Sequence, residues 1–149
     1  MKNNLTLFVI MVIGSYNFLI SQNFRGLDRS PMDKTYYPTS FRSPDKIVEI
    51  TYSRPQLRGR TFSEVVPDDK IWRTGANEAT LITIYKQIQI DEFILEPGTY
   101  TLFTIPKGNT IIVIVSKPNN NFNWGTYSYN SDDDILRFEV PLNKDENSL

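Results

Sequence analysis

The strongest constraint on the fold is the alternation of apolar and polar residues in the segment 80–90. From position 82 to position 90, every second residue apart from Lys86 is an isoleucine: Ile82, Ile84, Ile88 and Ile90. Successive side chains of a β-strand point to opposite faces, so this period predicts a strand with one apolar and one polar face. Asp91 and Glu92 then separate it from the apolar residues 93–95, which predicts a hairpin.

Shorter segments with the composition of strands follow one another along the chain, at 46–52, 71–73, 100–105, 110–116 and 135–142. They are rich in β-branched and aromatic residues, and prolines fall at or near their ends, where a missing N–H disturbs a sheet least. Only residues 62–66 have helical spacing, enough for one turn. Many short strands without a long helix predict an all-β fold, an antiparallel β-sandwich or a barrel-like domain.

Residues 1–21 have the pattern of a secretory signal peptide. Lys2 is followed by a largely apolar run from Leu5 to Ile20, and Ser21 offers a small residue for cleavage. The run is short for a membrane-spanning helix, which needs about 20 apolar residues. We therefore expect export to the periplasm, the cell surface or the medium, with no membrane span after cleavage. A retained N-terminal anchor is the alternative.

The chain expected after cleavage divides at Lys46. Residues 22–45 contain three prolines and little periodicity, which predicts an extended N-terminal arm. Residues 46–149 carry the predicted strands and are expected to form one β-domain. The 149-residue chain is 40% hydrophobic and 22% charged, values typical of a packed globular domain.

Two residue types are missing, and their absence narrows the possible chemistry. The chain has no cysteine and no histidine. It therefore has no disulfides, no thiolate nucleophile, no imidazole base and no ordinary zinc or haem site, so we expect no metal and no cofactor. The net charge of −1 gives no basic surface for nucleic acid. Enzymes without either residue exist, but the balance favours a protein that is not an enzyme.

Several motifs, in this order, resemble the domain-of-unknown-function family 2911 of exported bacterial proteins. They are Leu27–Asp33, Tyr36–Pro38, Tyr52–Pro55, Gly59–Thr61, Trp72–Thr80, Pro97–Phe103 and Trp124-Gly125. The resemblance implies a secreted all-β domain and implies no function. Members usually continue with further strands after the segment that matches Ile135 to Pro141. This chain is therefore expected to lack C-terminal strands, as a fragment or a shortened member.

The residues 72–78 form the leading candidate for a ligand-binding loop. Trp72 supplies an aromatic plane, Arg73 a guanidinium, Asn77 an amide and Glu78 a carboxylate, all around one glycine. Such groups could hold a carbohydrate or a small carboxylate. The alternative is an internally satisfied corner, in which Arg73 pairs with Glu78 or Glu64, Asn77 adopts a left-handed turn and Trp72 fills the core.

Four other groups carry weaker signals. The arginines Arg54, Arg58 and Arg60 could hold an anion, or form a solvated turn with surface ion pairs. Glu64 and Glu78 could act as an acid–base pair on a glycosidic bond, if the fold brings them together. Residues 132–134 are three consecutive aspartates, which lack the alternating spacing of a calcium loop. The aromatic loop with Trp124 could be a carbohydrate platform or a cap on the core, and Trp124 joins the candidate ligand-binding residues.

The sequence thus favours an uncharacterised exported β-domain that serves as a non-catalytic ligand-binding or structural module. Its expected ligand site contains Trp72, Arg73, Asn77, Glu78 and Trp124. One alternative is a carboxylate-dependent glycan hydrolase that uses Glu64 and Glu78. The other is a protein-interaction domain whose partner adds a strand to an edge of the sheet.

Expression in a bacterial host with an intact export pathway tests the targeting prediction. We expect a processed protein outside the cytoplasm whose N-terminal sequence begins at Gln22, because cleavage follows Ser21. N-terminal sequencing and mass spectrometry of the fractionated protein measure this. Unprocessed protein in the membrane fraction would instead support the retained anchor.

Overall fold

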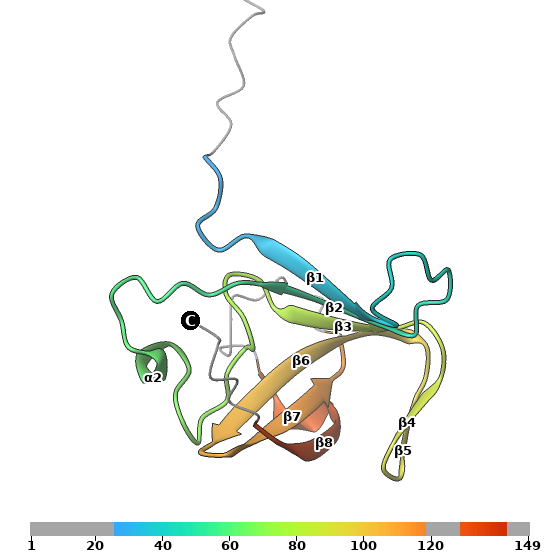
Figure 1. Ribbon diagram of the computed structural model, residues 1–149. Coiled ribbons are helices and arrows are strands. Elements are labelled where there is room, and N and C mark those ends of the chain that lie inside the picture. The colour runs from blue at the N-terminus through green and yellow to red at the C-terminus, as the bar shows by residue number, and fades with distance from the viewer. Residues whose placement is uncertain (1–25, 119–128, 143–149) are drawn as a thin grey trace, which may run out of the picture.

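A computed structural model of the chain describes residues 26–118 and 129–142. Six strands form one antiparallel sheet in the order β1-β2-β3-β6-β7-β8, and two more form a small hairpin, β4-β5 (Figure 1). The six are β1 (Met32–Tyr37), β2 (Val48–Ser53), β3 (Thr80–Ile84), β6 (Gly98–Lys107), β7 (Thr110–Ser116) and β8 (Asp134–Pro141). The predicted all-β, antiparallel fold is confirmed. In the described part of the chain the sheet stays open, with β1 and β8 at its edges.

The segment 80–90 is not one strand, as predicted, but two. β3 ends at Ile84, and the chain bends before β4 (Ile88–Ile90), which pairs with β5 (Phe93–Leu95) in the expected hairpin. The break falls at Tyr85 and Lys86, where the apolar alternation is interrupted. Lys86 stays exposed and its ammonium lies 3.3 Å from the carboxylate of Asp45, because a lysine cannot take the buried position that the alternation would give it.

The hydrophobic core lies between the sheet and this hairpin. Its buried residues come from β3, the hairpin, β6, β7 and β8: Ile82, Ile84, Leu95, Leu102, Val115 and Leu136. Ile88 and Ile90 of β4 pack against the same cluster. The bend at Lys86 therefore turns the second half of the alternating segment back over the sheet, where its isoleucines cover the core.

Strand β1 lies in the segment predicted to be an extended arm. It pairs with β2 along its whole length, from Met32 opposite Ser53 to Tyr37 opposite Val48. No side chain of β1 is fully buried, so the strand has no apolar alternation that could have predicted it. Backbone pairing and the ion pair between Lys34 and Glu49, 2.8 Å long, hold it to the sheet edge.

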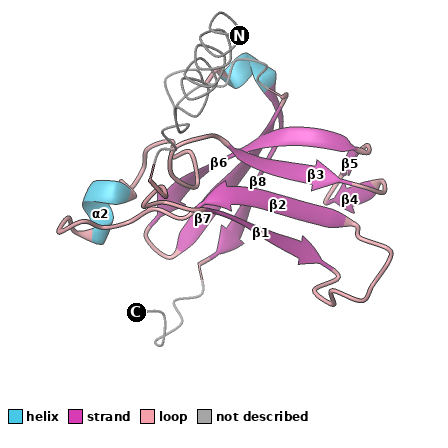
Figure 2. Cartoon of the chain, turned by 90° about the horizontal axis from the view of Figure 1, so that it is seen from above, coloured by secondary structure: helices cyan, strands magenta, loops and turns pink. Residues whose placement is uncertain are grey.

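The remaining elements are short. The predicted helical turn is confirmed as α2 (Phe62–Val65), and a single 3₁₀ turn, η3 (Ser131–Asp133), precedes β8. Figures 1 and 2 show α2 and the hairpin β4-β5 at opposite ends of the sheet. No helix among the described residues is both long and apolar enough to cross a membrane. The predicted signal peptide, residues 1–21, lies outside the described residues.

Truncation of the hairpin's core residue tests how much the hairpin contributes to stability. Leu95 is 1% exposed, so we expect Leu95→Ala to lower the free energy of unfolding by ~2–5 kcal/mol. The neighbouring Ile94 is 58% exposed, and Ile94→Ala should change it by less than about 0.5 kcal/mol. Urea unfolding of both variants measures this. Equal stability of the two variants would show that the hairpin does not cover the core.

Candidate functional site

The candidate loop is an insertion between two points of contact with β6. Trp72 forms an isolated bridge with Thr104, and Thr80 of β3 pairs with Leu102. These partners are two residues apart on β6 (104 − 102), whereas Trp72 and Thr80 are eight apart (80 − 72). The chain therefore leaves the sheet after Trp72 and returns at Thr80. We call residues 73–79 the insertion loop. The short strand predicted at 71–73 is reduced to this one bridge.

The insertion loop is fixed on the end of β2. The N–H of Ala76 donates to the carbonyl of Ser53, 2.9 Å away, and both Gly75 and Ala76 are buried. The hydroxyl of Thr80 donates to the carbonyl of Thr74 over 3.1 Å, which closes the loop at its base. Gly75 lies so close to β2 that a Cβ there would come 2.8 Å from the Thr80 hydroxyl and 3.2 Å from the Ser53 carbonyl.

Two residues of the loop have left-handed backbones, Thr74 at φ 60° and Asn77 at φ 54°. Asparagine tolerates this region, as the sequence suggested for Asn77, but a β-branched threonine rarely does. The hydroxyl of Thr74 is 3.1 Å from that of Thr104 on β6. The turn at Thr74 is thus held by its side chain, and such held backbone strain is common at functional sites.

The N-terminal segment 28–31 closes the other side of the loop. The amide of Asn77 donates to the carbonyl of Ser30 over 3.4 Å, and the N–H of Ser30 donates to the carboxylate of Asp28 over 2.6 Å. The pKa of Asp28 is lowered, first by the hydrogen bond from the Ser30 N–H, then by a hydrogen bond with the Asn77 side chain, and further by the positive charge of Arg58. The hydrogen bond between Asn77 and Ser30 thus joins residues that lie 47 positions apart in the sequence.

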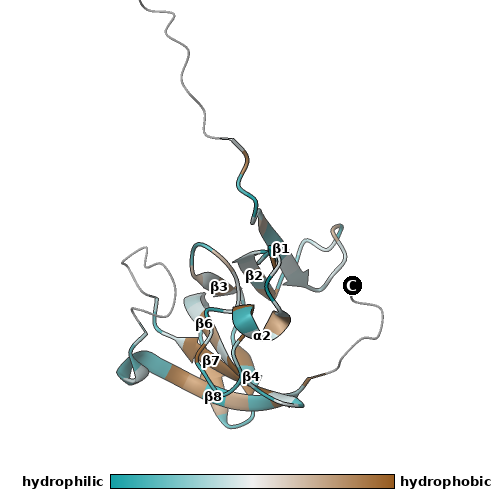
Figure 3. Cartoon of the chain, turned by 90° about the vertical axis from the view of Figure 1, so that its left-hand side faces the viewer, coloured by the Kyte–Doolittle hydropathy of each residue, from teal (hydrophilic) through white to brown (hydrophobic). Residues whose placement is uncertain are grey.

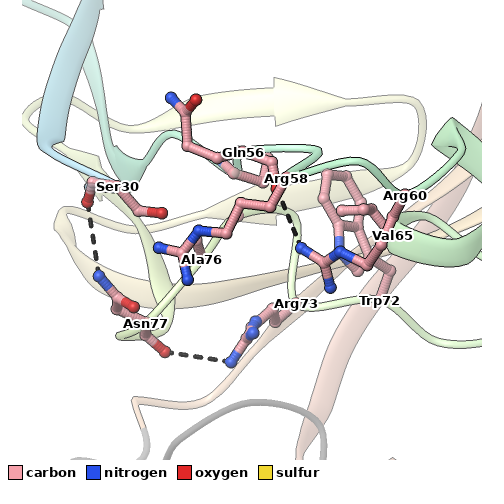
Figure 4. Close-up of a pocket in the computed structure, with 11 residues that line it drawn as sticks. Ser30, Gln56, Arg58, Arg60, Val65, Trp72, Arg73, Ala76 and Asn77 are labelled. Carbon is pink, nitrogen blue, oxygen red and sulfur yellow. Dashed lines mark hydrogen bonds between the residues drawn. The ribbon is translucent and has the colours of Figure 1, made fainter.

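A pocket of about 240 Å³ opens between the insertion loop, Ser30 and the loop 54–60 (Figure 4). Its polar lining comes from Ser30, Gln56, Arg58, Arg60, Arg73 and Asn77. Val65 of α2 and Trp72 also line it, and Trp72 is half-buried. The pocket therefore combines three residues of the predicted ligand site with two of the arginines that the sequence placed in a separate group.

Backbone carbonyls orient two of the three arginines that line the pocket, Arg60 and Arg73. Arg60 donates to two backbone carbonyls, from Nε to Leu57 over 3.0 Å and from Nη2 to Gln56 over 2.9 Å. Arg73 donates from Nη1 to the carbonyl of Asn77 over 3.3 Å. None of Arg58, Arg60 and Arg73 forms an ion pair with another described residue. Figure 4 shows their side chains around the same hollow.

The third arginine of the predicted set lies elsewhere. Arg54 pairs with Asp33 of β1, 3.4 Å away, and does not line the pocket. Arg58 instead adopts a left-handed backbone at φ 52°, and Gly59 follows at φ 79°. This double turn reverses the chain between Arg58 and Arg60, so that both can line one pocket. Two consecutive left-handed residues are the reason that a glycine stands at position 59.

The two candidate catalytic carboxylates serve other roles or lie in solvent. Glu64 accepts from the N–H and the hydroxyl of Thr61, at 2.6 and 2.9 Å, and so closes the first turn of α2. These two bonds lower the pKa of Glu64, the N–H more than the hydroxyl. Glu78 is exposed, and neither glutamate lines the pocket. The expected pairing of Arg73 with one of them is replaced by its bond to Asn77.

The acidic run 132–134 is used in structural contacts. Asp133 pairs with Lys117 at 3.8 Å, and Asp134 pairs with Arg137 at 2.7 Å. Asp134 also accepts from the hydroxyl of Tyr129 over 2.7 Å, which anchors the chain where it enters η3. No group of acidic side chains suited to a metal occurs among the described residues. Trp124 lies outside the described residues.

Sequence reasoning did not find two polar residues of the pocket, Ser30 and Gln56. Ser30 lies in the predicted arm, and its carbonyl meets Asn77 only because β1 pairs with β2. The backbone carbonyl of Gln56 accepts a hydrogen bond from Arg60. Any residue type could fill this role, so the sequence does not indicate it. The signal that could have found Ser30 is its place in the family motif Leu27–Asp33.

Substitution of the buried glycine tests the packing of the insertion loop. We expect Gly75→Ala to lower the free energy of unfolding by ~1–3 kcal/mol, because its Cβ would overlap the Thr80 hydroxyl and crowd the end of β2. Gly26→Ala is the control, since no atom lies within 4 Å of a Cβ at that position. Denaturant unfolding measures both. A Gly75→Ala protein as stable as the control would contradict the close approach.

Comparison with known protein families shows which family the chain matches. The pattern of a family described as "Protein of unknown function (DUF2911)" matches residues 30–149. No curated protein and no solved structure matches the chain. The match covers 120 of the 149 residues (149 − 30 + 1), including all the described residues of the pocket, and it confirms the resemblance seen in the motifs. The chain belongs to the DUF2911 family of proteins of unknown function.

Proposed function

We propose that this protein is an exported, non-catalytic binding module whose pocket holds a small oxyanion, a carboxylate or a phosphate. One observation carries the proposal: three guanidinium groups surround one pocket, and backbone carbonyls rather than carboxylates orient two of them. Export is part of the proposal and rests on the pattern of residues 1–21.

Orientation by a neutral acceptor leaves the charge of a guanidinium available to a ligand. Each guanidinium has five N–H donors. Arg60 uses two of its donors and Arg73 uses one on the backbone, so both keep free donors in a fixed direction. Preorganised donors of this kind suit carboxylate and phosphate, which accept two parallel hydrogen bonds from one guanidinium. The amide of Asn77, although it donates to Ser30, adds a further polar group at the same site.

The hydrolase alternative finds no support at this pocket. The general acid of a glycosidase needs a raised pKa, so that it carries a proton at neutral pH. The pKa of Glu64 is lowered instead, because its carboxylate accepts two hydrogen bonds from Thr61. A purely structural role also fits poorly, because a structural arginine cluster is normally paired with carboxylates. Strand addition at β1 or β8 would leave the unpaired arginines without an explanation.

The proposal predicts that phosphate or acetate binds and that the arginines determine the affinity. We expect Arg58→Gln, Arg60→Gln and Arg73→Gln each to weaken binding by about 10- to 100-fold, the effect of losing about 1.5–3 kcal/mol for a charged hydrogen bond. Isothermal titration and thermal unfolding with each anion measure this, since an anion at 100 times its Kd stabilises by about 2.7 kcal/mol.

The control for these variants is Arg42→Gln, which removes an arginine that lies 5.3 Å over the ring of Phe41, in the loop between β1 and β2. It should bind as the unchanged protein does. A wild-type protein that neither anion stabilises would contradict the proposal.

A further inference from the structure

We infer that the anion held by the pocket is the head of an amphiphile, whose apolar part lies outside the pocket on the exposed face of α2. The inference rests on the proposed function and adds the class of ligand. It follows from three properties of the site: the small size of the pocket, the polarity of its surface, and the distribution of apolar side chains around its rim.

The pocket is too small and too polar to hold more than a head group. Its volume of about 240 Å³ is below the ~300–1,000 Å³ of sites that enclose a whole organic ligand. Its surface is almost entirely polar, although Val65 and Trp72 contribute to the walls. An apolar group larger than a few carbon atoms would therefore have to extend past the rim.

The α2 side of the rim carries exposed apolar side chains. Phe62, the first residue of α2, is 68% exposed, and Val65, three positions later, lines the pocket. Residues three apart in a helical turn lie on the same face, so the exposed ring of Phe62 lies next to the Val65 side of the pocket. Leu57 is 46% exposed and stands between the lining residues Gln56 and Arg58. Figure 3 shows the apolar part of α2 at the surface.

The opposite side of the pocket would repel an apolar group. It is formed by Ser30 and Asn77, which are hydrogen-bonded to each other, and the Ser30 N–H donates to the carboxylate of Asp28. Glu78, the next residue of the insertion loop, is exposed. A ligand with an anionic head on the arginines is thus directed toward Phe62, because a chain lying over the polar side would cost the hydration of the groups there.

Two ligand series separate this inference from the proposed function. The first is acetate, butyrate, hexanoate and octanoate, and the second is inorganic phosphate with butyl and hexyl phosphate. We expect the affinity to rise by about two-fold for each added methylene. The binding free energy gained per methylene is then about half that of full burial, because the rim is open. The rise should stop once the chain extends past Phe62. Isothermal titration of the purified protein measures both series, and the series that binds more tightly identifies the head group.

The matched variants are Phe62→Ser and Phe41→Ser, which remove exposed phenylalanines at the rim and in a distant loop. Phe62→Ser should abolish the dependence on chain length and leave the affinity for acetate or inorganic phosphate unchanged, whereas Phe41→Ser should change neither. Affinity that is independent of chain length, or chain-length dependence that survives in Phe62→Ser, would overturn the inference while the anion pocket stands. Failure of every anion to bind would overturn the pocket as well.

Discussion

The pocket depends on the contact between the insertion loop and the end of β2. Gly75 and Ala76 lie against Ser53, and the hydrogen bond from the Ala76 N–H to the Ser53 carbonyl holds the loop to the last residue of β2. This contact fixes where the loop turns, and so where Arg73 and Asn77 stand. Because Ser53 also pairs with Met32 of β1, the same point fixes the segment that carries Ser30. Three motifs that are distant in the sequence meet at one strand end.

Such an arrangement costs stability, which makes a purely structural role difficult to explain. Left-handed backbones at Arg58 and Thr74 are unfavourable for residues of these types, and they occur in the two loops that form the pocket. Three guanidinium groups without ion pairs add mutual repulsion. Proteins commonly retain features of this kind where a ligand compensates for them. An oxyanion would satisfy the free donors and neutralise the charge at once.

The strands were predictable where burial imposes a pattern, and much less so where it does not. The alternating isoleucines of 82–90 predicted both the strand and the hairpin, and the position of Lys86 explains why the segment divides there. β1 could not be predicted, because its side chains are exposed and only backbone pairing holds it. The sequence also predicted a strand at Trp72, where the structure has a single bridge. Residue type does not reveal how far backbone pairing extends.

The candidate site was predictable in parts but not as a whole. Trp72, Arg73 and Asn77 stood out as a loop of binding residues, and Arg58 and Arg60 as a possible anion site, yet nothing in their spacing joined the two groups. Their meeting depends on long-range pairing between β1, β2 and the insertion loop. The sequence makes Glu64 a catalytic candidate, but a glutamate three residues after Thr61 is also the signature of a helix cap, which is its role here.

The central claim is that an oxyanion occupies the pocket between the three arginines. The most direct measurement is a crystal structure of the protein grown with selenate, whose anomalous scattering locates the anion independently of the protein's own density. The account predicts a selenium peak within hydrogen-bonding reach of Arg58, Arg60 and Arg73, with Arg60 and Arg73 still bonded to their backbone carbonyls. An empty pocket at saturating selenate, or arginines turned away to pair with carboxylates, would contradict it.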